Sequence, residues 1–190
     1  MKRQAHVAGY TLLELMIVVG LLGAMSLITA ASVSSWRGDA RQQNAAYSIL
    51  RLTQQAQGLA TRSGHSHMLR LSAGDNGRGL LTLLGGMNYS CLKTPWALAT
   101  EVGRYNMDSA VPGGSSRELK LTAEVNGANV DTLDLCVEPS GRTFAGPTGA
   151  MAVASGLTVL SVTGYNNSGV VTGTVRRVIF EPGGRARMQR

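Results

Sequence analysis

The sequence predicts an α+β chain in which one long N-terminal helix precedes a small β domain. Three patterns indicate this: a run of 22 uncharged residues from Leu15 to Trp36, an apolar stripe at helical spacing further on, and two-residue alternation between glycine-rich turns from His67 onward. Glycine supplies 24 of the 190 residues, and charged residues make up only 15 %. This composition favours a turn-rich β domain over a helical bundle.

The uncharged run is long enough to cross a membrane. At about 1.5 Å per residue it gives roughly 33 Å of helix, against about 30 Å of hydrocarbon. Lys2 and Arg3 precede it and favour a cytoplasmic N-terminus. We therefore expect residues 10–36 to form one membrane span, with Trp36 at the interface and the rest of the chain on the far side.

Glu14 is the one carboxylate at the start of this apolar segment. A charge inside a membrane helix costs on the order of 2.5–3.5 kcal/mol. Either Glu14 lies near the interface or is protonated, or it meets a cation at the same depth. If the chain is cut after Gly9, the new amino group of Tyr10 lies one helical turn away, and Glu14 of one subunit can neutralise this amine of a neighbour.

The segment Gly9-Tyr10-Thr11-Leu12-Leu13-Glu14-Leu15 resembles the processing site of type IV prepilins and type II secretion pseudopilins. The resemblance implies that a membrane peptidase removes the leader 1–9 after Gly9, that Tyr10 becomes the N-methylated terminus, and that Glu14 serves assembly. Tyr10 departs from the family's usual Phe. The alternative is a secretory signal peptide cut after the small residues 29–31, but a carboxylate at the position of Glu14 has no use there.

Residues 37–64 predict an amphipathic continuation of the helix. Its apolar stripe comprises Ala45, Ile49, Leu52, Ala56 and Leu59, and we expect polar residues such as Gln42 on other faces. Gly64 is a natural stop. After Gly38, Asp39 is in a position to cap a second helix and so introduce a kink.

Residues 65–190 predict the β domain. The expected strands are His67–Ser72, Gly79–Leu84, Glu118–Val125, Thr132–Glu138, Leu157–Thr163 and Thr174–Glu181. Two glycine- and proline-containing connections, Gly103–Ser116 and Pro139–Gly156, are expected to be surface loops.

A short motif occurs twice, as Val137-Glu138-Pro139-Ser140-Gly141-Arg142 and as Phe180-Glu181-Pro182-Gly183-Gly184-Arg185. Each copy predicts a strand, a Glu-Pro turn and a restart at Gly-Arg. The first copy and the segment Gly184-Arg185-Ala186-Arg187 are similar to motifs of minor pseudopilins of the GspH/FimT type. That resemblance implies a long N-terminal helix packed on two small antiparallel sheets.

Cys91 and Cys136 both follow the expected membrane span. In an oxidising periplasm they can form one disulfide, closing a loop of about 45 residues. The alternative is two unpaired thiols, with Cys136 packed as a small apolar residue. No further Cys or His lies at a spacing suited to a metal site.

The C-terminal residues 176–190 are basic, with five arginines and one acid: Arg176, Arg177, Arg185, Arg187, Arg190 and Glu181. In some minor pilins of the resembled group, a Gly-Arg-x-Arg segment takes part in DNA binding. This resemblance puts forward Arg185 and Arg187 as DNA-binding residues. The alternative is a solvated strand whose charges aid solubility or meet an acidic neighbouring subunit.

Other polar residues do not indicate catalysis. His65 and His67 are expected to be exposed connector residues. Alternation predicts that Asp131, Asp134 and Glu138 face solvent opposite the apolar residues of their strand. The sequence contains no nucleotide-binding or nucleophile motif, and we expect no enzyme activity, cofactor or metal.

Together these features predict a bacterial inner-membrane protein with a single span and a periplasmic C-terminal domain. Its expected role is that of a minor pilin or pseudopilin of a type IV pilus or type II secretion system, at or near the filament tip. Its expected partners are prepilin peptidase, the inner membrane, other major and minor pilins or pseudopilins and, if the basic C-terminus serves uptake, DNA. A third hypothesis is a monomeric membrane-anchored periplasmic protein.

Overall fold

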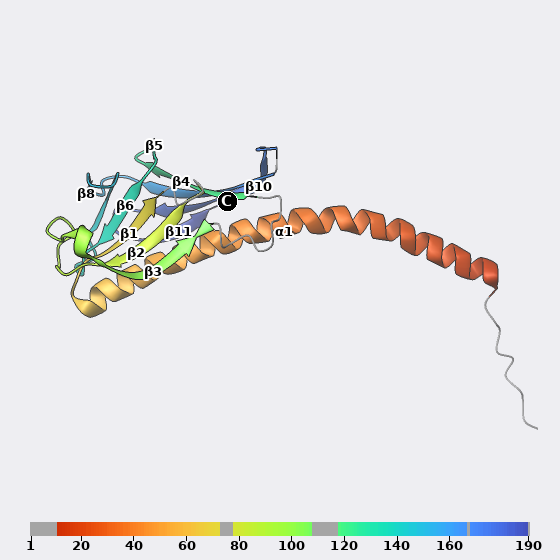
Figure 1. Cartoon of the computed structure of the whole chain (residues 1–190), viewed down its shortest axis with the longest axis horizontal. Coiled ribbons are helices and arrows are strands. Elements are labelled where there is room, and N and C mark those ends of the chain that lie inside the picture. Colours follow the sequence, from red (N-terminus) through yellow and green to blue (C-terminus); the bar gives the residue numbers. More distant parts are fainter. Residues whose placement is uncertain (1–10, 73–77, 108–117, 167, 190) are drawn as a thin grey trace, which may run out of the picture. The chain divides into compact units, whose positions relative to one another are not determined.

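The structure is a computed structural model that describes residues 11–72, 78–107, 118–166 and 168–189, without the side chains of residues 26–38. By its internal contacts the chain forms two units, Met1–Arg37 and Gly38–Arg190. In chain order the elements are α1 (Leu12–Ser63), β1 (His67–Ser72), β2 (Leu80–Gly85), the 3-10 helix η1 (Trp96–Leu98), β3 (Thr100–Asn106), β4 (Glu118–Val125), β5 (Ala128–Val130), β6 (Leu133–Val137), β7 (Thr143–Gly146), β8 (Ala152–Val153), β9 (Thr158–Tyr165), β10 (Val171–Phe180) and β11 (Ala186–Gln189) (Figure 1).

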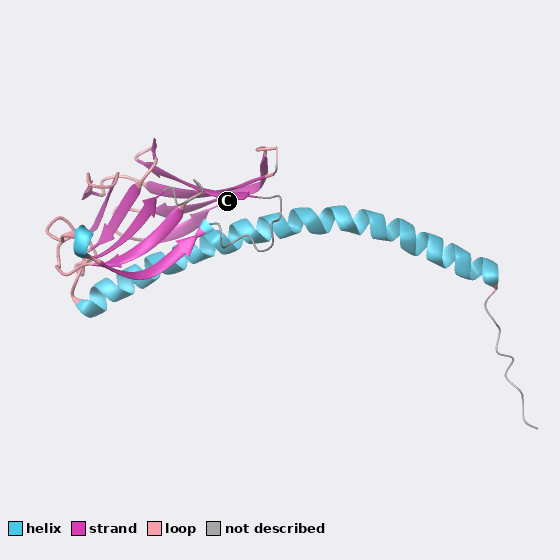
Figure 2. Cartoon of the chain, viewed as in Figure 1, coloured by secondary structure: helices cyan, strands magenta, loops and turns pink. Residues whose placement is uncertain are grey.

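The strands form two antiparallel sheets, as Figure 2 shows in magenta. The first sheet has the order β3-β2-β1-β6-β7-β8, and the second has the order β11-β10-β9-β4-β5. The prediction of an α+β fold with a helix and two antiparallel sheets is confirmed.

The main core joins the C-terminal part of α1 to both sheets. Ala45, Ile49 and Ala56 of the predicted stripe are buried in it, while Leu52 and Leu59 are partly buried against it. Each sheet contributes aliphatic side chains, among them Leu69 from the first and Leu160 from the second. The small alanines let the helix backbone approach the sheets closely, so the predicted apolar stripe is confirmed.

A second, smaller core lies on the opposite face of the first sheet. It is formed by Met68, Cys91, Cys136 and Phe144. Met68 and Leu69 are neighbours on β1, and successive strand residues point to opposite faces, so this sheet is apolar on both sides. The segment that carries Cys91 and the partly buried Trp96 covers this second face.

The expectation that Asp39 caps a second helix is wrong. α1 runs through this position without interruption. The Asp39 carboxylate instead accepts a hydrogen bond from the Thr174 N–H at 3.0 Å. Gln42 is also not on a solvated face: it is 1 % exposed, and its Nε2 donates to the Thr172 carbonyl at 2.6 Å.

These two side chains attach the helix to a bulge in β10, where the pairing with β9 shifts between Thr172 and Arg176. Gly164 and Gly173 border the attachment, and a Cβ on either would clash with the Gln42 or Asp39 side chain. We call this contact between Asp39, Gln42 and the bulge the latch.

All six predicted strands are present with shifts of at most three residues at their ends. Both predicted loops are wrong in part. The range Gly103–Ser116 begins inside β3, and its residues 108–116 lie outside the described residues. The range Pro139–Gly156 contains β7, whose four residues are all buried, and the short strand β8.

Candidate functional site

The first turn of α1 holds Glu14, and Thr11 precedes the helix. The Glu14 N–H donates to Thr11 Oγ1 at 3.3 Å, so Thr11 caps one of the free backbone donors. Glu14 occupies the third helical position, where the helix dipole favours a negative charge. Gly9 and Tyr10, the predicted processing site, lie outside the described residues.

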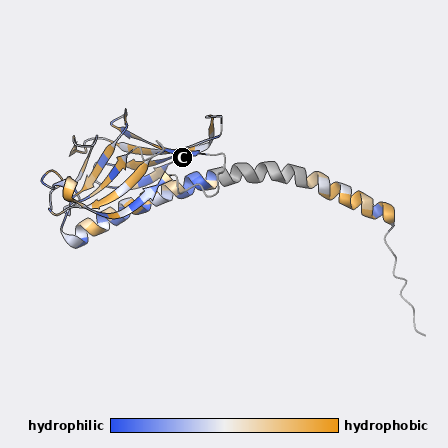
Figure 3. Cartoon of the chain, viewed as in Figure 1, coloured by the Kyte–Doolittle hydropathy of each residue, from blue (hydrophilic) through white to orange (hydrophobic). Residues whose placement is uncertain are grey.

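The next turns of α1 are apolar on every side (Figure 3). The large apolar side chains from Leu12 to Met25 are exposed, from 49 % for Val18 to 80 % for Leu12. Residues 26–36 of the predicted membrane span lie outside the described side chains. Among the described residues, no helical stretch meets the length and apolarity needed to span a membrane.

Cys91 and Cys136 form a disulfide, with Cα atoms 6.0 Å apart. The bond ties the segment before β3 to the next-to-last residue of β6. The same segment is held by the Trp96 Nε1–H, which donates to the Cys91 carbonyl at 2.9 Å, and by the Ser66 and Thr94 hydroxyls at 2.9 Å from each other. The disulfide and these hydrogen bonds therefore hold the segment around Cys91 and Trp96 in place over the second core.

The predicted solvent face of β6 is wrong for Asp134 and Glu138, which are 1 % and 8 % exposed; Asp131 is exposed. The Asp134 carboxylate accepts two hydrogen bonds from Arg70, at 2.7 and 2.9 Å, and one from Thr148 Oγ1 at 3.2 Å. The hydrogen bond with Asp134 raises the pKa of Arg70. The sequence could not reveal the covering layer that buries these acids.

His65 is exposed, but the prediction of an exposed His67 is wrong. His67 opens β1 and is 5 % exposed, with its Nδ1 at 3.1 Å from the His65 carbonyl. Burial lowers the pKa of His67 below its usual value of 6.5. Among the described residues, no group of three or more potential metal ligands gathers, and neither histidine belongs to one.

The repeated Glu-Pro motif forms the same turn twice, once in each sheet. Between β6 and β7, the Glu138 N–H donates to the Arg142 carbonyl at 2.9 Å, and the Gly141 N–H donates to the Glu138 carbonyl at 2.9 Å. Between β10 and β11, the equivalent bonds are Glu181 to Arg185 at 2.9 Å and Gly184 to Glu181 at 2.8 Å. We call these the first and second Arg turns.

The left-handed backbone of each turn falls on its glycine, with φ of 84° at Gly141 and 80° at Gly184. This conformation closes a tight hairpin and suits glycine because it has no Cβ. The arginine that follows each glycine, Arg142 or Arg185, is exposed.

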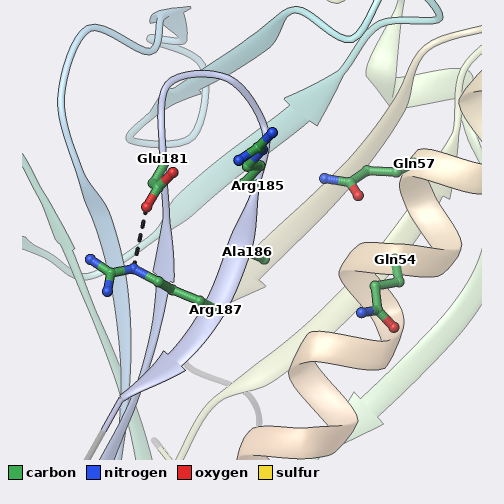
Figure 4. Close-up of a pocket in the computed structure, with 6 residues that line it drawn as sticks. All are labelled: Gln54, Gln57, Glu181, Arg185, Ala186 and Arg187. Carbon is green, nitrogen blue, oxygen red and sulfur yellow. Dashed lines mark ion pairs between the residues drawn. The ribbon is translucent and has the colours of Figure 1, made fainter.

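The second Arg turn lies beside α1. Gln57 Nε2 donates to the Gly184 carbonyl, and Gln54 and Gln57 line a groove of about 410 Å³ together with Glu181, Arg185, Ala186 and Arg187 (Figure 4). Arg187 pairs with Glu181 at 3.2 Å. Among the described residues, no carboxylate pairs with Arg185.

The basic C-terminus is less uniform than predicted. Arg176 is 5 % exposed on β10, whereas Arg177, Arg185 and Arg187 are exposed. Arg190 lies outside the described residues. The structure thus brings Arg185 and Arg187 to one groove and adds Gln54 and Gln57 from α1, which the sequence analysis did not connect with them.

Sequence reasoning also missed Arg142 as a candidate. The guanidinium carbon of Arg142 lies 5.4 Å from the centre of the Phe144 ring. The sequence does carry a signal for this residue, because the repeated motif ends in arginine in both copies.

Neither a protein-family model nor a curated protein matches this sequence. Among solved structures, the chain is similar to the type IV minor pilin FimU of Pseudomonas aeruginosa (strain PAO1). The two share 13 % sequence identity with a TM-score of 0.45, over 78 % of this chain and 87 % of the other.

Proposed function

We propose that this chain is a non-enzymatic minor pilin or pseudopilin subunit. It is inserted in the bacterial inner membrane with its β domain in the periplasm, cut by prepilin peptidase after Gly9, and assembled through its N-terminal helix. The assembly is a type IV pilus or a type II secretion pseudopilus, with this subunit at or near the tip.

The observation that carries the proposal is the uncovered apolar start of α1. Every large apolar side chain from Leu12 to Met25 is exposed, and the residues Gly38–Arg190 form a separate compact unit with its own core. Contiguous apolar surface of this kind marks a site of association with lipid or protein. A helix is suited to both, because it satisfies its own backbone hydrogen bonds.

Glu14 supports association with other subunits over a purely lipid-buried anchor. The Glu14 carboxylate stands among Leu12, Leu13 and Leu15, where lipid alone would penalise its charge. A neighbour's free amine at the same depth supplies the missing cation and sets the axial register between the two helices.

The test is replacement of Glu14 by Ala in the producing bacterium. We expect normal membrane insertion and cleavage but strongly reduced recovery of the subunit in sheared filaments. Glu14→Asp, which keeps the charge, is the matched control. Equal incorporation of Glu14→Ala would contradict the proposal, as would a mature N-terminus near Ser32 instead of Tyr10.

A second candidate function is DNA binding through Arg185 and Arg187. The specific observation is that both guanidinium groups are exposed at one groove and that no described carboxylate pairs with Arg185. Exposed arginines bind phosphates through bidentate hydrogen bonds and release of counterions. Replacing both with Ala should weaken binding to duplexes of any sequence, and unchanged gel shifts at low salt would exclude this function.

A further inference from the structure

We infer that the two Arg turns form a single surface for the phosphodiester backbone of nucleic acid, in which Arg142 contacts phosphate together with Arg185. This inference rests on the second candidate function and extends it to a residue outside the C-terminal segment. The first Arg turn belongs to the other sheet, about 40 residues earlier in the sequence.

The two turns lie against each other. A Cβ built on Gly184 would be 2.9 Å from Thr143 Oγ1 and 3.5 Å from the Gly141 carbonyl oxygen. Gly141 and Thr143 flank Arg142, and Gly184 precedes Arg185. With about 3.8 Å between successive Cα atoms, the two arginine backbones are on the order of 10 Å apart. Two long side chains based this close together can reach phosphates of one short stretch of duplex.

Among the described residues, neither turn's acid pairs with the arginine of the same turn. The Glu138 carboxylate is 8 % exposed and accepts the Cys91 N–H at 3.1 Å, so it does not neutralise the surface. In the second turn Glu181 makes its ion pair with Arg187 and not with Arg185, so the groove carries two exposed arginines and one acid. Each copy of the motif contains one acid and one arginine. The arginines Arg142 and Arg185 are exposed, so the surface of the two turns is mainly positive.

Arg142 is held ready for such a contact. Its guanidinium carbon lies 5.4 Å from the centre of the buried Phe144 ring, within the range of a cation–π contact, and this contact restrains the side chain. Within the part of the chain that the structure describes, no hydrogen bond or ion pair of the Arg142 guanidinium is formed, so its N–H donors are available for a phosphate. Among the described residues, no carboxylate competes for them.

The surroundings favour a phosphate backbone over an acidic protein. Protein interfaces are usually centred on buried apolar or aromatic anchors. None of the exposed large apolar side chains of the described residues belongs to either turn. The turn tips carry proline, serine and glycine, which offer little for reading base edges or for stacking, so binding should be independent of sequence.

The test measures binding of the full chain, solubilised in a non-ionic detergent, to a fluorescent DNA duplex of arbitrary sequence between 50 and 200 mM salt. Each phosphate contact contributes about 0.9 to the slope of log K against log salt concentration. Arg142→Ala and Arg185→Ala should each reduce the magnitude of this negative slope by about 0.9, and the double variant should reduce it by about 1.8. Arg142→Lys, which keeps the charge, should retain the slope.

Arg51→Ala is the matched control, because Arg51 is an exposed arginine beside β3, at the opposite edge of the first sheet from β7 and β8. It should leave the slope unchanged. An equal effect of Arg51→Ala would overturn the inference, since binding would then follow total charge alone.

The experiment distinguishes a wrong role for Arg142 from a wrong assignment of DNA binding itself. If Arg142→Ala binds like the wild type while Arg185→Ala/Arg187→Ala is weakened, the role of Arg142 is wrong and DNA binding stands. If Arg142→Lys is as weak as Arg142→Ala, Arg142 acts through its contact with Phe144, and the inference is wrong. If the wild type does not bind the duplex at 50 mM salt, both are wrong, and an acidic protein surface becomes the better partner.

Discussion

At the scale of single residues, the largest departures from expectation are Asp134 and Glu138. Both were expected to face solvent, but both are buried on the face of the first sheet that carries the second core. Asp134 alternates with Leu133 and Leu135 along β6, a pattern that normally places an acid in solvent. Here the outer face of the sheet is itself covered, so Asp134 is buried and is satisfied by Arg70 and Thr148. A strand pattern identifies two faces but does not tell what lies on each.

Asp134→Ala should lower the free energy of unfolding by about 1–3 kcal/mol, because Arg70 and Thr148 lose their acceptor in a largely buried position. The lower part of this range is favoured by the partial exposure of Arg70, whose side chain is 31 % accessible. Urea denaturation provides the measurement. Asp131→Ala, at an exposed position of the same segment, should change stability by less than about 0.5 kcal/mol; equal effects would show that the ion pair adds nothing.

Burial of His67 predicts a loss of stability in acid. Its folded pKa lies below the usual 6.5, so the unfolded chain takes up a proton first as the pH falls. The contribution of this group to folding is therefore full above about pH 6.5 and declines from there towards the lower folded pKa. Thermal melting at pH 7.5 and 5 should show a larger shift for the wild type than for His67→Gln, while the exposed His65→Gln should behave like the wild type.

At the scale of the element, the second Arg turn joins three parts of the fold. Gly184 adopts φ of 80°, gives its carbonyl to Gln57 of α1, and leaves no space for a Cβ next to Thr143. Gly184 therefore has three structural roles: it adopts the left-handed backbone, it bonds to α1, and it contacts the residues next to the first Arg turn.

Gly184→Ala should destabilise the chain by at least about 1–2 kcal/mol from the left-handed conformation alone, with a further cost from the contact with Thr143. Gly183→Ala is the matched control, because nothing lies within 4 Å of its Cβ position and its φ is not left-handed. Chemical denaturation compares the two. A similar loss in both variants would mean that turn flexibility, and not the close approach, determines the effect.

The disulfide between Cys91 and Cys136 is another contact that joins distant segments of the fold. Removing it by Cys91→Ser/Cys136→Ser should cost about 3–4 kcal/mol if closure of the 45-residue separation acts through chain entropy. The loss should appear in urea denaturation and should match that of the wild type under reducing conditions. Free alkylation of both cysteines in the native, unreduced protein would contradict the bond.

At the scale of the whole molecule, the chain forms two units, Met1–Arg37 and Gly38–Arg190. We expect a fragment of residues 38–190 to fold with the cooperativity of the full chain, because it contains the latch, both sheets and both cores. Light scattering should find it monomeric without detergent. The full chain should self-associate under the same conditions, owing to the exposed apolar residues of α1. An unfolded fragment by circular dichroism would show that the first unit is needed for folding.

Much of this architecture was accessible from the sequence, because periodicity and turn residues are local signals. The apolar stripe of α1 and the strand His67–Ser72 follow from them directly. The buried strand β7 was missed because its four residues, Thr143–Gly146, have no long alternating pattern and follow a proline-glycine turn. Contacts between distant segments, such as those of Gln42 and of the paired Arg turns, depend on tertiary packing that no local pattern encodes.

The latch has a mechanical consequence. Tension applied along the helix axis from the N-terminal side enters the folded domain at Asp39 and Gln42, which are bonded to the Thr174 N–H and the Thr172 carbonyl. Part of the pulling force is thereby diverted into the β9–β10 hairpin before it can travel to Ser63, where the helix ends. If such subunits assemble into a filament as proposed, we expect a stretched filament to load this hairpin before the part of the helix nearest Ser63.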